Sequence, residues 1–245
     1  SIPDTDTGVV GTNMFVYCNN NPIEFIDPNG HSIQSAFKSM QVVFSKIICF
    51  LGYLVKKTPP SKVYNSVFAL VNYNFNIGIE KGYEKSIIYG QGRSPYNEFR
   101  IGASTVSESG CEVVAVYNAL LFLNKPLTLS RIIYDFEYNG WTFPSGVLGS
   151  NPDQINKFFK KYNIEYRKYN NLKNYKKSIK RGDMGIISFW NEDPIHEGLH
   201  TVFFIYTGKT FLVYNYTNFS VDYVRISTVS EIILDDGKFI VGYIL

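Results

Sequence analysis

One cysteine stands where a polypeptide chain can make a thiol reactive. Cys111 follows Ser109-Gly110 and opens a run, residues 111–123, in which apolar residues recur with helical spacing. A helix N-terminus carries about half a unit of positive charge, which lowers the pKa of a thiol placed there. Its backbone N–H groups can also hold the oxyanion that forms when a nucleophile attacks a carbonyl carbon. This position favours nucleophilic catalysis by Cys111, whereas Cys18 and Cys49 have no base among their neighbours.

A nucleophilic cysteine needs a base, and the chain has three histidines. His31 lies in a turn-rich segment far away in sequence, and His196 lies in a loop spanning residues 191–198. His200 opens a β-branched and aromatic run, residues 200–207, which is typical of a strand. A histidine at a strand edge that faces a helix N-terminus has the geometry of a Cys–His pair, so we predict His200 as the base.

A third group must orient the imidazole. Residues 211–216 form a second strand-like run, and Gly208-Lys209 between the runs is typical of a tight hairpin turn. Pairing about that turn returns Asn215 to the level of His200. We therefore predict a ring nitrogen of His200 at about 3–4 Å from the Cys111 sulfur. The Asn215 side chain should bond the other ring nitrogen, with Asn218 as the substitute.

The elements that position these residues follow from periodicity and turn chemistry. Helices are predicted over residues 111–123, 130–138 (capped by Ser130), 151–162 and 171–180. Strands are predicted over residues 184–190, 200–207, 211–216, 221–226 and 239–245. Helices precede an antiparallel meander, which indicates an α+β fold with a helical lobe, including the nucleophile helix, packed on the sheet.

The residue order and layout resemble the papain-like fold, and are most similar to bacteriocin-leader-processing peptidases and papain-fold toxin domains. The resemblance covers about residues 85–245 and includes Ser109-Gly110-Cys111, His200 at a strand start, and Asn215. It implies a papain-like cysteine peptidase with Cys111, His200 and Asn215 as its triad. Many such enzymes carry a glutamine a few residues before the cysteine as an oxyanion donor. Here Thr105 takes that place, and Glu112 follows the cysteine where Gly or Trp is usual.

The N-terminal segment resembles a different family. Residues 13–30, NMFVYCNNNPIEFIDPNG, are similar to the end of an Rhs/YD-repeat core, which marks the junction with a variable C-terminal toxin. The resemblance implies that residues 1–30 end such a core and that the later residues are the toxin of a bacterial polymorphic toxin system. It also implies secretion or delivery into a target cell, and a cognate immunity protein as a partner.

Two further regions complete the predicted organisation. Residues 31–60 form a linker in which 32–57, capped by Ser32, have apolar residues at helical spacing. We interpret them as an amphipathic helix packed on a core, with membrane contact as the alternative. Residues 61–245 form the catalytic domain.

Charge and composition argue against a nucleic-acid-binding function. The net charge is only +3, and charged residues make up 18% of the chain. We interpret the basic residues between 160 and 181 as a solvated face rather than a nucleic-acid site. The histidines and cysteines lack metal-ligand spacing, so no metal or cofactor is expected. The leading hypothesis is a cysteine peptidase acting on a protein or peptide through a thioester. The alternatives are a glutamine deamidase or acyltransferase using the same triad, and a non-enzymatic binding or membrane-active module.

Overall fold

The computed structural model describes residues 60–83, 85–142, 149–191, 198–233 and 237–245. The chain divides into two compact units, residues 1–60 and 61–245, and the second is described below. Several predictions therefore fall outside the described residues: the Rhs-like segment, the helix over 32–57, and His31, His196, Cys18 and Cys49. Along the described part of the chain, no helix combines the length and the apolar composition needed to cross a membrane.

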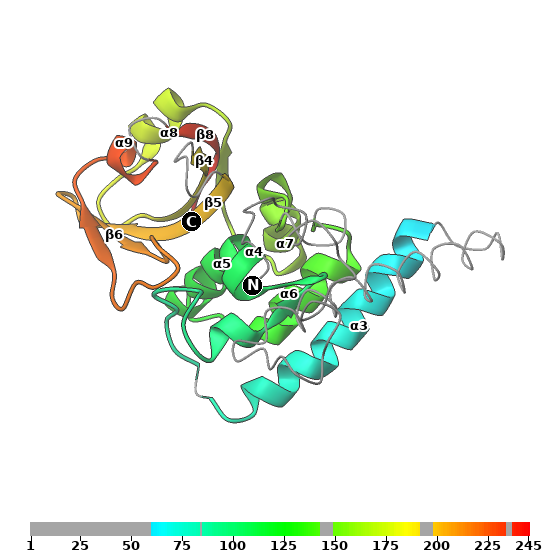
Figure 1. Ribbon diagram of the computed structural model, residues 1–245. Helices are drawn as coiled ribbons and strands as arrows, with labels where there is room; N and C mark the ends of the chain where they lie inside the picture. Colours follow the sequence, from blue (N-terminus) through cyan, green and yellow to red (C-terminus); the bar gives the residue numbers. More distant parts are fainter. Residues whose placement is uncertain (1–59, 84, 143–148, 192–197, 234–236) are drawn as a thin grey trace, which may run out of the picture. The chain divides into compact units, whose positions relative to one another are not determined.

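A six-stranded sheet with the order β3-β8-β4-β5-β6-β7 forms one half of the unit, and every neighbouring pair is antiparallel (Figure 1). Its strands are β3 (Arg167–Tyr169), β4 (Met184–Asn191), β5 (Gly198–Tyr206), β6 (Phe211–Tyr214), β7 (Val224–Ile226) and β8 (Lys238–Ile244). The predicted hairpin is confirmed, because β5 pairs with β6 across a turn in which Gly208 has φ of 94°. Strands β4 to β7 pair consecutively, as the predicted meander requires, but the last predicted strand does not follow β7, because β8 inserts between β3 and β4.

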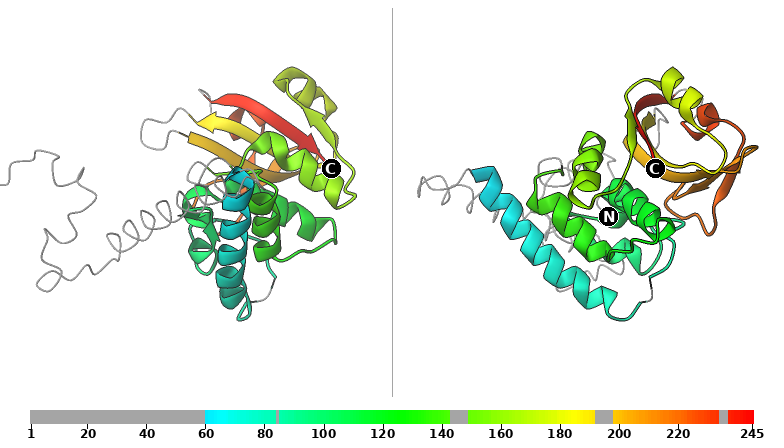
Figure 2. Two further views of the ribbon diagram at one scale, coloured as in Figure 1. Left: turned by 90° about the vertical axis from the view of Figure 1, so that its right-hand side faces the viewer. Right: turned by 180° about the vertical axis from the view of Figure 1, so that it is seen from behind.

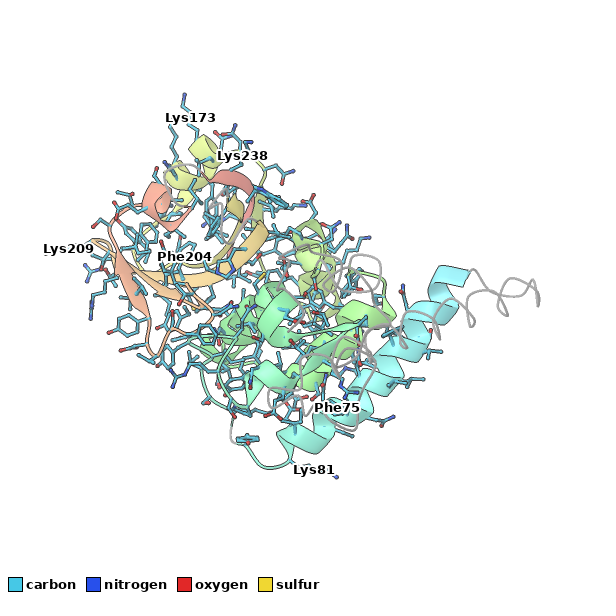
Figure 3. All side chains as sticks on the ribbon, viewed as in Figure 1. Phe75, Lys81, Lys173, Phe204, Lys209 and Lys238 are labelled. Atoms are coloured by element: carbon cyan, nitrogen blue, oxygen red, sulfur yellow. The ribbon has the colours of Figure 1, made fainter. Side chains whose placement is uncertain are left out.

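Helices lie on both faces of the sheet (Figure 2). Helix α5 (Cys111–Phe122) packs on β4 and β5, and α6 (Leu129–Tyr138) packs on α5. Together with α7 (Ile155–Lys161) they bury the larger core against Ile186, Phe203 and Tyr243. On the opposite face, α8 (Leu172–Ser178) and α9 (Val229–Ile232) enclose a second core that includes Phe204, labelled in Figure 3. The unit is thus α+β, with the two cores separated by the sheet.

The helices expected in the middle of the chain form with small differences at their ends. Helix α5 starts at Cys111 as predicted. Helix α6 is capped by Thr128, whose side chain accepts a hydrogen bond from the Arg131 N–H, so the predicted cap at Ser130 is wrong. Asn151 caps a 3₁₀ turn, Pro152–Gln154, that leads into α7, and Asn171 caps α8.

The elements that were not predicted are mostly short or rich in asparagine. They are α3 (Pro60–Glu80), the 3₁₀ turn Tyr96–Glu98, β1 (Arg100–Ile101), β2 (Ser104–Thr105), α4 (Val106–Ser109), β3 and α9. Helix α3 contains four asparagines, two of them, Asn72 and Asn76, fully buried. Asparagine lowers intrinsic helix propensity because its side chain competes for backbone groups. In α3 the two buried amides bond to the backbone of Gly102 and Arg100 instead, and so attach the helix to β1 and the turn that follows.

A buried carboxyl completes this attachment. Glu137 of α6 accepts hydrogen bonds from the Gly102 N–H and the Asn72 amide through Oε1. Its Oε2 is buried and has no hydrogen-bond partner among the described residues. Burial raises the pKa of Glu137 to about 8, and the two hydrogen bonds oppose that rise. The folded protein therefore holds a proton on Glu137 at pH values where the unfolded chain has released it.

Glu137→Gln should remove a pH dependence of stability. Between pH 4.5, the ordinary pKa, and about 8 the folded state binds more protons than the unfolded state, so stability falls as pH rises. Glutamine keeps the Oε1 acceptor and does not titrate. We expect urea unfolding at pH 5 and pH 8.5 to show a decline in the wild type that is smaller in the variant, by a few kcal/mol in order of magnitude. The exposed-site change Glu165→Gln should leave the decline intact. If stability declined equally in Glu137→Gln and in the wild type, the result would contradict the burial of the Glu137 carboxyl.

Candidate active site

Cys111 is the first residue of α5, immediately after the one-turn helix α4. Thr105 and Glu108 form a capping box at the start of α4. Gly110 joins the two helices so closely that a Cβ there would lie 2.6–2.7 Å from atoms of Val106. Glycine at this position therefore allows the chain to turn sharply before Cys111. The N-cap residue of α5 is Gly110, which has no side chain to cap the helix, and Glu112 is the acidic residue of its first turn.

Cys111 is 6% exposed, and its thiol lies next to polar groups. Its Sγ is 3.3 Å from Glu112 Oε2 and 3.8 Å from the carbonyl oxygen of Leu199, the residue before His200. Helix α5 and strand β5 thus meet at the sulfur, although Cys111 and Leu199 are 88 residues apart in sequence. The structure brings Cys111 to the start of the strand that carries His200.

The pKa of Cys111 is raised well above its ordinary value, which corrects the expectation of a lowered one. Burial is the largest cause, followed by the charge of Glu112 and the hydrogen bond to it. Hydrogen bonds from Thr201 act in the opposite direction but are smaller. Burial and Glu112 therefore outweigh the lowering effect of the helix N-terminus on the Cys111 pKa, and the resting group is a neutral thiol.

Glu112 is a fully buried carboxyl behind the sulfur. Its Oε2 accepts from the Cys111 thiol and lies 3.4 Å from the Ser150 N–H, and its Oε1 lies 3.4 Å from the Thr201 hydroxyl. Burial raises the pKa of Glu112 to about 7, while these hydrogen bonds favour the ionised form. The charge next to the thiol therefore changes near neutral pH.

His200 lies on β5 with its ring edge-on to Phe189 of the second core, at 5.7 Å between centroids. Its Nε2 is 2.9 Å from the backbone carbonyl oxygen of Asn215. A carbonyl only accepts, so Nε2 carries the proton and Nδ1 is left as the acceptor. Burial lowers the pKa of His200, partly opposed by hydrogen bonds to the backbone of Asn215 and Tyr216. The imidazole is thus neutral and able to take a proton.

Asn215 reaches His200 in a different way from the one predicted. Its backbone carbonyl contacts the ring, whereas its side-chain amide bonds to Gln91 in both directions. The cause is local backbone geometry: Asn215 has φ of 57°, which ends β6 and turns the carbonyl toward His200. The substitute, Asn218, donates its amide to the Ser107 carbonyl oxygen instead.

The predicted hydrogen bond between Cys111 and His200 is not among those formed by the described residues. The Thr201 hydroxyl lies near Glu112, whereas the His200 ring contacts Phe189, its cross-strand neighbour on β4. The structure therefore brings the two elements together and leaves the sulfur and the ring without a direct hydrogen bond.

Two buried polar residues near this site, Gln91 and Thr201, carry no signal for a sequence-based prediction. Their partners come from distant parts of the chain. Glu112, in contrast, is marked by its position directly after Cys111. Within the described ranges, no group of three or more His, Cys, Asp and Glu side chains is arranged to hold a metal ion.

No protein-family model matches the chain, and no curated protein or solved structure matches it. The arrangement of Cys111, Glu112, His200 and Asn215 is therefore interpreted from its own chemistry. Among these groups, a thiol at a helix start and a neutral imidazole are of the types that act as nucleophile and base in covalent catalysis.

Proposed function

We propose that residues 61–245 are a cysteine-dependent amide hydrolase with a papain-like arrangement, acting on a protein or peptide. One observation carries the proposal. The Cys111 sulfur lies 3.8 Å from the backbone of Leu199, directly before a His200 whose Nε2 is held by Asn215. In unliganded enzymes catalytic hydrogen bonds are often long and tighten when substrate binds. In our proposal, substrate binding brings Nδ1 of His200 to the sulfur.

The reaction then proceeds by two acyl transfers. His200 Nδ1 takes the thiol proton as Sγ attacks the carbonyl carbon of an amide, which forms a tetrahedral oxyanion. In the proposed reaction, N–H groups at the start of α5 stabilise that oxyanion. The imidazolium returns its proton to the leaving amine, leaving a thioester on Cys111. Water, deprotonated by His200, hydrolyses the thioester and releases the acid. Asn215 holds the ring through its carbonyl, which favours the charged imidazolium as well.

The same chemistry serves deamidation of a glutamine side chain, where ammonia leaves instead of a chain end, and acyl transfer to an amine. We propose peptide hydrolysis as the main reaction and these as variants of it. A binding or membrane-active function has no specific observation in its favour among the described residues.

The biological setting is part of the proposal and rests on residues 13–30. Their similarity to the end of an Rhs/YD-repeat core supports a bacterial polymorphic toxin whose C-terminal module is delivered into a target cell. A module that hydrolyses cellular proteins would require an immunity protein in the cell that makes it. Membrane contact, if it contributes to delivery, is assigned to residues 32–57.

Cys111→Ala tests the proposal in cells. Expression of the wild-type chain in bacteria should stop growth, and proteomics should reveal new protein termini or glutamate in place of glutamine. The variant should restore growth and lose those products, because Cys111 supplies the nucleophile in the proposed reaction. New termini would support the peptidase, and conversion of glutamine without new termini would support the deamidase. Equal toxicity of both proteins would contradict a cysteine-dependent mechanism.

A further inference from the structure

A buried amide links the two sides of the candidate active site. The segment Tyr89–Gly92 runs along the loop that follows β6, and two backbone hydrogen bonds join them. The Asn215 N–H donates to the Tyr89 carbonyl oxygen at 2.9 Å, and the Gly92 N–H donates to the Asn218 carbonyl oxygen at 2.7 Å. The approach at Gly90 is so close that a Cβ would lie 2.6 Å from the Asn218 carbonyl oxygen. This segment therefore forms a fixed support beneath the turn that presents Asn215.

Gln91 and Asn215 form a matched pair of hydrogen bonds within that support. The Gln91 backbone N–H donates to Asn215 Oδ1 at 2.8 Å, and Asn215 Nδ2 donates to Gln91 Oε1 at 2.7 Å. Both side chains are buried, with exposed fractions of 3% for Gln91 and 0% for Asn215. Buried hydrogen bonds do not exchange with water, so the pair resists rotation of Asn215. The side chain of Asn215 is thus used to fix its own backbone.

The other end of Gln91 reaches the nucleophile side. Its Nε2 donates to the carbonyl oxygen of Ser107 at 3.2 Å, and the Asn218 amide donates to the same oxygen at 3.0 Å. Ser107 belongs to α4, which leads through Gly110 into Cys111. One amide side chain therefore connects the turn that holds His200 with the short helix that presents Cys111.

We propose that Gln91 is a positioning residue that holds the Asn215 carbonyl against His200 and so fixes the imidazole proton on Nε2. The catalytic consequence rests on the proposed function, because only a base at His200 needs Nδ1 free of its proton. The structural consequence, a single imidazole tautomer, does not depend on that function. Gln91 touches neither the sulfur nor the ring and acts through Asn215.

The test replaces Gln91 by methionine in the full chain. Methionine has a similar length, so Gln91→Met removes the side-chain hydrogen bonds while filling the space. Ring ¹⁵N resonances of histidine-labelled protein, with the signals assigned through His31→Ala, His196→Ala and His200→Ala, report the tautomer and the pKa of His200. In the variant, the Nε2–H tautomer should lose its dominance and the His200 pKa should fall, since the bond to the Asn215 backbone raises it.

A matched control exists on the same support. Asn118 of α5 makes an equivalent buried pair of hydrogen bonds, with the Ile88 N–H and carbonyl oxygen at 3.0 and 2.8 Å, and does not contact Asn215. Asn118→Leu should lower stability without changing the tautomer of His200. An unchanged tautomer and pKa in folded Gln91→Met would overturn the proposal, as would an equal change in Asn118→Leu.

A second variant and a second readout distinguish a failure to fold from a failure of the proposed role of Gln91 or of the proposed function. If Gln91→Met does not fold, Asn215→Gly removes both bonds while glycine accepts the positive φ, and it should show the same loss of the single tautomer. Alkylation of Cys111 by iodoacetamide should slow about tenfold in either variant, because His200 then accepts the thiol proton less effectively. Should wild type and His200→Ala alkylate equally fast, the proposed function fails, yet the ¹⁵N result still decides the role of Gln91.

Discussion

Replacing His200 by alanine is expected to slow amide hydrolysis by about 10²- to 10⁴-fold, the range for loss of a general base. The imidazole is neutral, its Nε2 proton is committed to the Asn215 carbonyl oxygen, and Nδ1 is the nitrogen left to accept from the thiol. Because burial and Glu112 keep Cys111 protonated at rest, attack without a base requires thiolate that is scarce near neutral pH. The measurement is the release of product from a peptide library, with kcat and KM determined separately. The loss should lie in kcat.

His31→Ala is the comparison for this experiment. His31 lies in a turn-rich segment far from Cys111 in sequence, so we expect its replacement to leave the hydrolysis rate unchanged. Retained activity in His200→Ala together with loss in His31→Ala would reverse the assignment of the base. Loss in neither would remove histidine from the mechanism and direct attention to Glu112 as the acceptor of the thiol proton.

Glu112→Gln is expected to make Cys111 more reactive. An ionised Glu112 raises the pKa of the adjacent thiol by its charge and by accepting its hydrogen bond. Glutamine carries no charge and can donate to a thiolate, so the pKa of Cys111 should fall. Each pKa unit changes the thiolate fraction about tenfold, so alkylation by iodoacetamide at pH 8 should be about tenfold faster than in the wild type.

The pH dependence of that difference follows from Glu112 itself. Its pKa is raised to about 7, so below pH 6 wild-type Glu112 is protonated and the two proteins should alkylate at similar rates. The advantage of Glu112→Gln should grow as pH rises through 7. Glu137→Gln is the matched control, because Glu137 is equally buried and belongs to the contact between α3 and α6 rather than to the sulfur. A constant difference at all pH values, or slower alkylation in Glu112→Gln, would exclude a charge effect on the thiol.

The sequence is informative where structure is local. Apolar periodicity and caps predict α5 and α8 closely, and the Gly208-Lys209 turn predicts the pairing of β5 with β6, because neighbouring residues determine these features. The position of β8 between β3 and β4 depends on pairing between residues far apart in sequence, such as Arg167 with Ile244, which are 77 positions apart. No local pattern encodes that choice.

The same distinction applies to the candidate site. Cys111 at a helix start and Asn215 near His200 follow from elements that local patterns predict. The raised pKa of Cys111 does not, because it depends on how deeply α5 is buried against β5 and on where the Glu112 side chain lies. Similarly, the sequence suggests a contact through the Asn215 side chain, whereas the backbone carbonyl of Asn215 contacts His200. That contact depends on the Asn215 φ of 57° and on Gln91, which comes from a distant segment.

The position of β8 between β3 and β4 sets the order in which the sheet can be completed during synthesis. Strands β4, β5, β6 and β7 are adjacent in sequence and can pair as soon as they leave the ribosome. Strand β3 is made earlier than all of them, yet its partner β8 is made after them, so it waits unpaired while more than sixty residues are added. A chain stopped before Lys238 would leave β4 and β3 with exposed edges, which is a state prone to aggregation. An interrupted translation product would therefore be a substrate for quality control rather than a partly active enzyme.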